Sequence, residues 1–144
     1  MSPAARCGDG LPPFELAFPG PLRDRLVAAV LDGSKTTTTG LLADYELERE
    51  PLPQVGARSV LIDSEGRPVA VVEILGVEVV ALAEVSLTHV LGEGEGDRSV
   101  VQWRAGHETF WQGAQARAEL GARFTVDDAT PVVLEKFRVV RRLP

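Results

Sequence analysis

Hydrophobic residues recur at helical spacing in two parts of the chain. The first part begins at Pro21, and its apolar positions lie three or four residues apart, at Leu22, Leu26, Val30 and Leu31. Gly33 follows where a helix of that length ends. The second part begins at Ser99, which has capping-box spacing to Gln102, and its aromatic positions then share one face: Trp103, His107, Phe110 and Trp111. These patterns predict two amphipathic helices, and aromatic residues at this spacing more often form core than a base-stacking platform.

Runs of β-branched residues predict three strands. Arg58–Asp63 and Val69–Val80 flank the turn residues 64–66, which is the pattern of a hairpin, and Gly76 predicts a bend or bulge in its second strand. Pro131–Arg142 alternates and forms a late strand. Because the strands arrive as a hairpin and a late return strand, we do not expect a regular parallel βαβ alternation. The predicted class is α+β, a small curled sheet with attached helices.

The remaining segments carry weaker signals. We expect a loose tail at residues 1–13, irregular chain with one turn of helix over 41–54, a short helix over 83–91, and an acidic glycine loop over 92–97. The length of 144 residues fits one domain, which we place at residues 14–144.

Charge and composition narrow the function. The net charge of −6 disfavours indiscriminate binding of polyanions, so any contact with nucleic acid must be local. Cys7 is the single cysteine, and with two histidines there is no zinc-ligand spacing, so we expect no structural metal and no cofactor. The first residues lack a signal-peptide pattern, and glutamates interrupt the most apolar stretch, so we expect a cytoplasmic protein that does not enter the membrane.

Lys35 and the threonines that follow it, Thr36 to Thr39, form the first candidate site. Thr36 and Thr38 face one way in an extended chain, and Thr37 and Thr39 face the other. A partly desolvated lysine can lose its proton and activate a hydroxyl. The alternative, which the residues alone favour, is a lysine that neutralises a helix C-terminus, next to threonines that suit a strand.

Two groups of acidic residues form further candidates. Glu93, Glu95 and Asp97 crowd one loop, and like charges raise a carboxyl pKa toward the range of a general acid; the alternative is a solvated surface loop. Glu135 lies on the apolar face of the last strand, so its carboxylate needs a buried donor or cation, for which Lys35 or Arg104 are candidates. Glu135 is then either a site residue or a structural anchor, and the residues alone favour the anchor.

Four ordered segments, GSKTTTTG, EGEGDRS, WRAGH and VVLEKFRVV, resemble the ASCH-domain family, and the resemblance spans about residues 14 to 142. It implies a PUA-like fold, which is a small β-barrel flanked by helices, with a cleft beside the Lys/Thr motif. Some small bacterial members are amidohydrolases that remove acetate from N(4)-acetylcytidine. Other members are ribonucleases or bind RNA without catalysis.

The resemblance implies a catalytic set of Lys35, Thr38 and Glu93, in which Lys35 is the base, Thr38 attacks the acyl carbon, and Glu93 or Glu95 protonates the departing amine. We add as substrate-binding residues Thr36, Glu95, Arg58 and Glu135. The partner is then a small nucleoside. The alternative is a module for single-stranded RNA, in which Lys35, Arg58 and Arg138 meet phosphates. A third hypothesis is a metabolite-binding cleft without chemistry. Under the catalytic hypothesis, Lys35→Ala abolishes turnover and leaves the melting temperature nearly unchanged.

Overall fold

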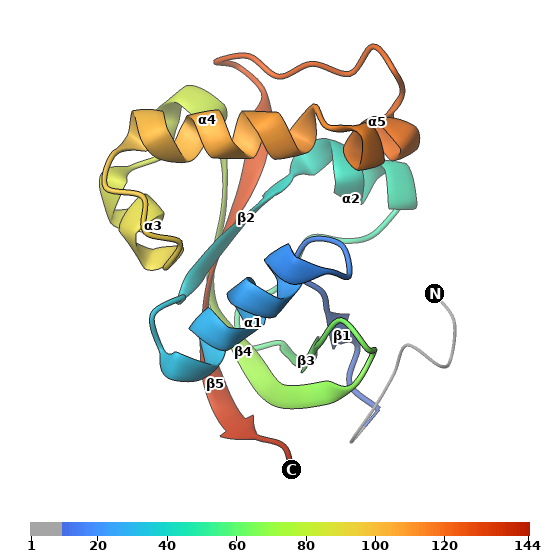
Figure 1. The fold of residues 1–144 in the computed structure, drawn as a ribbon, viewed down its shortest axis with the longest axis vertical. Coiled ribbons are helices and arrows are strands. Elements are labelled where there is room, and N and C mark those ends of the chain that lie inside the picture. The colour runs from blue at the N-terminus through green and yellow to red at the C-terminus, as the bar shows by residue number, and fades with distance from the viewer. Residues whose placement is uncertain (1–9) are drawn as a thin grey trace.

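The structure, a computed structural model, describes residues 10–144, and its centre is a curled five-stranded sheet (Figure 1). The strands are β1 (Pro13–Phe14), β2 (Thr37–Leu41), β3 (Arg58–Ile62), β4 (Pro68–Ala81) and β5 (Pro131–Arg142). The helices are α1 (Pro21–Asp32), α2 (Leu42–Glu48), α3 (Leu87–Gly92), α4 (Val100–Trp111) and α5 (Ala114–Leu120), with a 3-10 turn, η2, at Leu82–Glu84. The predicted α+β class is confirmed.

The order of strands in the sheet is β1-β3-β4-β5-β2, and this order leaves β2 at an edge. β3 and β4 form the predicted antiparallel hairpin, and β4 and β5 form a long antiparallel ribbon. The irregularity predicted at Gly76 is a bulge, because the register moves from Ile74 opposite Phe137 to Gly76 opposite Lys136 and passes over Leu75. The ribbon therefore bends at the level where β2 begins.

Two hydrophobic clusters stabilise opposite ends of the sheet. The first joins α1 to β3, β4 and β5 and contains Val30, Leu61, Val72, Ile74 and Phe137. The second joins α3 and α4 to β2 and β5 and contains Leu41, Val90, Trp103, Trp111 and Val132. In Figure 1, α1 and α4 cross the molecule at different heights, with β2 running between them. Trp103 and Trp111 are thus core residues, as their spacing indicated.

The start of α4 confirms the predicted cap. Ser99 Oγ accepts a hydrogen bond from the Gln102 amide at 3.0 Å. The Gln102 side chain bonds in return to the amide of Arg98 at 2.9 Å, one residue earlier than in a standard capping box. Two side chains thus satisfy backbone amides at this helix end.

Four segments differ from the expectations. The helix expected over 83–91 is divided into the 3-10 turn η2 and the helix α3. Residues 42–48 form a full helix rather than one turn, since good helix formers precede the prolines at 51 and 53 that would break it. The helix α5 was not predicted. In the expected tail, residues 1–9, with Cys7, lie outside the described residues, whereas Pro13 pairs with Val60 and the carbonyl of Pro12 accepts from the Val60 amide at 2.9 Å.

A buried arginine fixes the loop before α1. Arg23 donates to the carbonyls of Leu16 at 3.0 Å and Ala17 at 2.9 Å, and Ala17 has the left-handed φ of 57° that non-glycine residues rarely adopt. The next residue, Phe18, lies against Phe110 of α4, with 5.6 Å between the ring centroids. The loop therefore ties the α1 half of the molecule to the α4 half.

Candidate active site

A buried ion pair joins the edge strand to the glycine loop. α1 ends at Gly33, and the chain turns into β2 through Lys35. The Lys35 ammonium donates to Glu93 Oε1 at 2.8 Å, to the Thr37 carbonyl at 2.8 Å and to the Glu93 carbonyl at 3.4 Å. Lys35 is 2% exposed and Glu93 is 1% exposed. The ammonium therefore lies inside the protein and bonds to acceptors from both segments.

Glu93 is satisfied at both carboxylate oxygens. Its Oε2 accepts from the Thr39 hydroxyl at 2.7 Å and from the Trp103 indole at 3.0 Å. The Nε2 atoms of His89 and His107 each lie 3.6 Å from the same oxygen. Burial by itself raises the pKa of the Glu93 carboxyl, but His89, Lys35 and His107 together outweigh burial and hold this pKa well below its usual range. Glu93 is thus a carboxylate at any physiological pH.

This arrangement limits what Lys35 can do in the resting protein. The three hydrogens of its ammonium match its three acceptors. For Lys35 to act as a base, it would first have to pass a proton to Glu93, whose low pKa opposes the transfer. The pair fixes a positive charge and a carboxylate at the edge of β2.

Thr38 points to the other side of β2. It lies opposite Glu135 in the antiparallel pairing of β2 with β5, whereas Thr39 lies opposite Leu134. Opposite residues of an antiparallel pair share one face of the sheet, and neighbours in sequence alternate faces. Thr38 therefore shares a face with Glu135, while Thr39 reaches Glu93 on the other side.

Glu135 is buried, at 7% exposure, as its strand position predicted. Of the two candidate partners, Arg104 is wrong, because it pairs with Glu108 and Asp128. Tyr45 of α2 forms its hydrogen bond instead, and Lys35 acts on it through charge alone. Burial raises the pKa of the Glu135 carboxyl to about 7, although the Tyr45 bond and the Lys35 charge both lower it.

The raised pKa of Glu135 predicts how stability depends on pH. Between its ordinary 4.5 and about 7 the folded protein holds a proton that the unfolded chain has lost, so this contribution to stability falls as pH rises through that window. The gap corresponds to roughly 3 kcal/mol. Glu135→Gln removes this dependence. Its free energy of unfolding, measured in urea at pH 4 and pH 8, should therefore increase relative to that of wild type as the pH rises. Glu78→Gln, which changes an exposed glutamate of β4, should leave the slope unchanged; a wild-type slope in the Glu135→Gln variant would contradict the assignment.

The glycine loop packs directly on the backbone around Lys35. The Thr36 amide donates to the Gly92 carbonyl at 2.7 Å. Gly94 has a φ of 69°, and a Cβ there would stand 2.5 Å from the carbonyl oxygen of Ser34. Glycine at position 94 thus allows a close backbone approach, and the neighbour is the protein's own chain.

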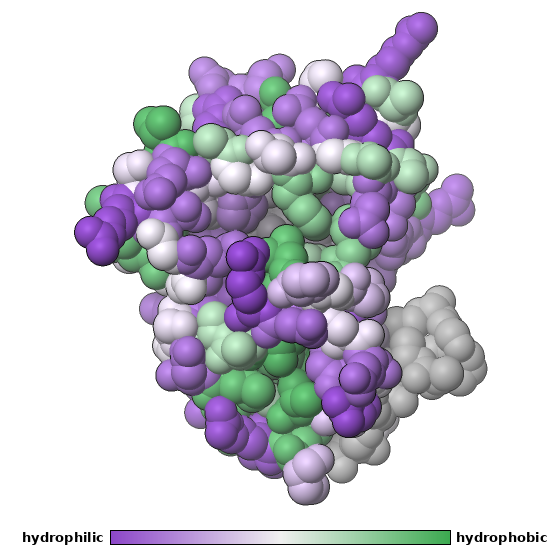
Figure 2. Space-filling view, in the orientation of Figure 1, coloured by the Kyte–Doolittle hydropathy of each residue, from purple (hydrophilic) through white to green (hydrophobic). Residues whose placement is uncertain are grey.

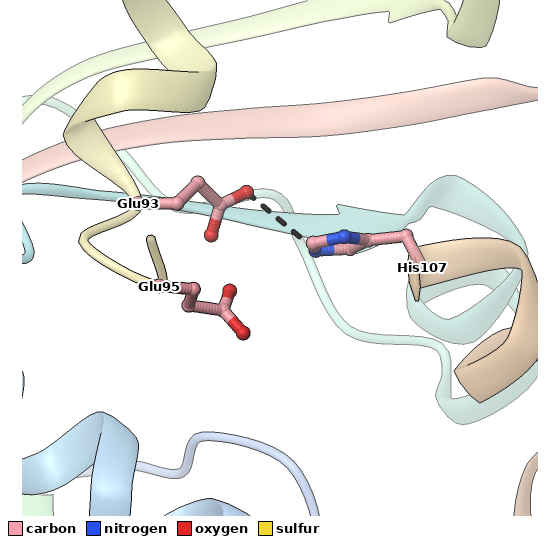
Figure 3. Close-up of side chains that lie close together, drawn as sticks. All are labelled: Glu93, Glu95 and His107. Carbon is pink, nitrogen blue, oxygen red and sulfur yellow. Dashed lines mark ion pairs between the residues drawn. The ribbon is translucent and has the colours of Figure 1, made fainter. Parts of the chain in front are cut away.

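Glu95 follows in the same loop with an exposed side chain. The ligand-type atoms of Glu93, Glu95 and His107 lie within 4.8 Å of one another, and Figure 3 shows the three side chains converging. Although the residue as a whole is exposed, partial burial of its carboxyl and the charge of Glu93 raise the pKa of Glu95, and Lys35 and His107 oppose this rise. Because Lys35 already neutralises Glu93, the group offers a divalent cation little net negative charge.

A hollow of about 190 Å³ lies next to Glu95, between the glycine loop and α1, lined by Arg25, Leu26, Ala29, Gly94 and Glu95. In Figure 2 the surface is recessed below α4, and polar side chains border the recess. A small molecule in this region meets Glu95 directly and lies close to the Lys35 and Glu93 pair behind it.

Other predicted residues lie away from this hollow. Thr36 is exposed, next to Gly92. Arg58 and Arg138 both pair with Glu73, at 3.7 Å and 2.7 Å, so the expected basic edge is partly neutralised. Lys35 is buried and takes no part in a surface of that kind.

The sequence interpretation did not assign three polar residues to the site: His89, Trp103 and Tyr45. Thr39 was part of the candidate threonine run, but it was given no role of its own. Since the single hydroxyl hydrogen of Thr39 goes to Glu93, its oxygen accepts from His89 Nε2 at 2.7 Å. His89 precedes Glu93 by four residues, which is helical spacing, and this signal was available in the sequence. Nothing in the sequence indicated Tyr45, because its role depends on how α2 packs against β5.

Comparisons with known proteins agree with this fold. A family model described as the ASCH domain matches residues 15–141. The ASCH domain from Lactobacillus crispatus is 29% identical, with a TM-score of 0.77 over 90% of this chain and 79% of that one. A protein from Enterococcus faecalis is 24% identical, with a TM-score of 0.78 over 90% of this chain and 76% of that one. The chain belongs to the ASCH domain family.

A mutant ASCH protein from Zymomonas mobilis is more distant, at 14% identity and a TM-score of 0.51 over 91% of this chain and 73% of that one, and it supports the fold alone. No protein of curated function matches the sequence. Within residues 10–144, none of the helices combines the length and apolar character needed to cross a bilayer.

Proposed function

We propose that this protein is an amide hydrolase for a small modified nucleoside of the N(4)-acetylcytidine type. The observation that carries the proposal is the fully buried Lys35–Glu93 ion pair behind the hollow at Glu95. Burying two charges costs several kcal/mol of desolvation per ion, and fixed charges of this kind are typical of functional sites.

Thr38 and Glu95 belong to opposite faces of β2, so the proposed reaction requires a substrate that crosses the edge of this edge strand. Thr38 Oγ forms a bond to the acetyl carbon, and the bond from that carbon to the exocyclic nitrogen breaks. Glu95, whose pKa is raised, gives its proton to the departing nitrogen. Water then releases acetate from Thr38. Lys35 and Glu93 hold β2 and the glycine loop together and supply a fixed electrostatic environment.

Charge favours a small neutral substrate over a polynucleotide. The net charge is −6, and the side chain of Glu95 faces the hollow. A nucleoside carries no phosphate and meets no repulsion there, whereas a nucleic acid strand does. The RNA-binding alternative has the support of family membership, but Arg58 and Arg138 share one glutamate.

Two isosteric variants of neighbouring threonines test the proposal. Thr38→Val removes the attacking hydroxyl, so release of cytidine and acetate from N(4)-acetylcytidine, followed by chromatography, should fall to background. Thr39→Val removes a hydrogen bond to the Glu93 carboxylate, which costs about 1–3 kcal/mol of stability, and the variant should keep most of the turnover of wild type.

The opposite pattern, with turnover lost in Thr39→Val and kept in Thr38→Val, would move the nucleophile to Thr39. Wild-type protein that leaves N(4)-acetylcytidine intact would refute the proposed substrate. Melting temperatures of both variants serve as the control for folding.

A further inference from the structure

We propose that Glu135 is the residue that takes the proton of the Thr38 hydroxyl, and that Tyr45 is the positioning residue for its carboxylate. The inference rests on the proposed function and adds the base that the reaction needs. Glu135 belongs to β5 and Tyr45 belongs to α2, and neither residue is a member of the Lys35–Glu93 ion pair.

The pairing of the strands places the two groups together. Thr38 and Glu135 lie directly opposite each other in the antiparallel pairing of β2 with β5. In that geometry the two Cβ atoms are about 4.5–5.5 Å apart on one face of the sheet, within reach of a carboxylate and a hydroxyl. Thr39, by contrast, is committed to Glu93 and His89 on the other face.

Glu135 has the chemical properties of an available base. It is buried, and within residues 10–144 it takes part in none of the ion pairs. Its hydrogen-bond donor is the Tyr45 hydroxyl, and one donor leaves lone pairs of the carboxylate free. Burial raises its pKa to about 7, which makes it a better proton acceptor than an ordinary glutamate and still leaves it largely ionised above pH 7.

The charged and titratable groups around Glu135 are few. Tyr45 acts on it from α2, and Lys35 acts from the start of β2. Its neighbour Lys136 lies opposite Thr37 and so faces the other side of the sheet. The ionisation of Glu135 is therefore controlled by its burial, the Tyr45 phenol and the Lys35 ammonium.

The proton balance closes over the two half-reactions. As Thr38 Oγ bonds to the acetyl carbon, its proton passes to Glu135. When water attacks the acyl group, one of its two protons passes to the solvent and the other stays in the acetic acid formed, while Glu135 returns its proton to Thr38 Oγ. The acetic acid then ionises in the solvent. Glu95 regains from solvent the proton that it gave to the amine.

The test is the pH dependence of kcat/KM for wild type, Glu135→Gln, Tyr45→Phe and the control Glu78→Gln, with two substrates. These are N(4)-acetylcytidine and p-nitrophenyl acetate, whose leaving group needs no protonation by Glu95. Wild type and Glu78→Gln should lose activity tenfold per pH unit below about 7. Glu135→Gln should fall by about 10²–10⁴-fold and lose this limb of the profile.

Tyr45→Phe distinguishes a base from a structural anchor. The Tyr45 bond lowers the pKa of Glu135, so its removal should move the limb to higher pH while activity at alkaline pH is kept. This readout decides the question even if Glu135→Gln fails to fold. Two results would overturn the role of Glu135 and leave the hydrolase function standing. One is an acid limb of the kcat/KM profile that does not move in Tyr45→Phe, and the other is Glu135→Gln activity within threefold of wild type. A wild type that cleaves neither substrate overturns both proposals.

Discussion

Lys35→Met is expected to destabilise the fold by about 3–5 kcal/mol, because it leaves the Glu93 carboxylate buried without its cation. The sequence interpretation expected a substitution at Lys35 to spare the melting temperature, and burial of the ammonium at 2% exposure reverses that expectation. The free energy of unfolding in urea, measured by tryptophan fluorescence, reports the change directly, since Trp103 donates to Glu93.

Two further variants show whether the unpaired charge is the cause. The double variant Lys35→Met with Glu93→Gln leaves no charge in the pair, so it should recover part of the lost stability. Arg67→Met removes an exposed cation that pairs with Asp63 and Glu65, and it should cost less than about 1 kcal/mol. A Lys35→Met protein as stable as Arg67→Met would show that Glu93 finds another partner.

Gly94→Ala is expected to displace the glycine loop and abolish turnover. The new methyl group would stand 2.5 Å from the carbonyl oxygen of Ser34, and real Cβ atoms do not approach backbone so closely. The loop must move away from the strand, which separates Glu93 from Lys35 and carries Glu95 out of the hollow. Loss of several kcal/mol of stability should accompany the loss of activity, as for other overpacked and strained sites.

Gly96→Ala is the matched control in the same loop. Gly96 also has a positive φ, of 88°, but a Cβ there has no heavy atom within 4 Å. The control therefore carries the backbone strain of about 1–2 kcal/mol without the collision. Equal effects of the two alanines on urea stability and turnover would show that conformation, rather than the approach to Ser34, makes glycine necessary at Gly94.

Much of the fold could be predicted because its signals are local. The periodicity from Pro21, the cap at Ser99 and the turn at 64–66 depend on residues a few positions apart, and the structure has a helix or a hairpin at each. The short strand β1 was missed because it gains its hydrogen bonds from β3, about 47 residues later. The helix α5 was also missed, and it packs against α2 and α4.

The candidate site likewise combines features that the sequence indicates with features that only the structure shows. The alternation of side chains along an extended segment is enough to place Thr38 and Thr39 on opposite faces, and the acidic loop is recognisable from its composition. The partners were not recognised, because Lys35 and Glu93 are 58 positions apart and the choice between Arg104 and Tyr45 for Glu135 depends on helix packing. A residue type indicates which partners suit it, but it does not say which one the chain brings near.

Local sequence patterns were sufficient for the two amphipathic helices, the hairpin, the family resemblance and the set of acids, hydroxyls and amine available for chemistry. Only the folded arrangement determines which of these groups meet: Lys35 is buried against Glu93, and Glu135 lies opposite Thr38. The difference arises because helix and turn preferences act over a few bonds. Burial and charge pairing, by contrast, depend on distances in space, which the packing of the two clusters and the pairing of β2 with β5 set.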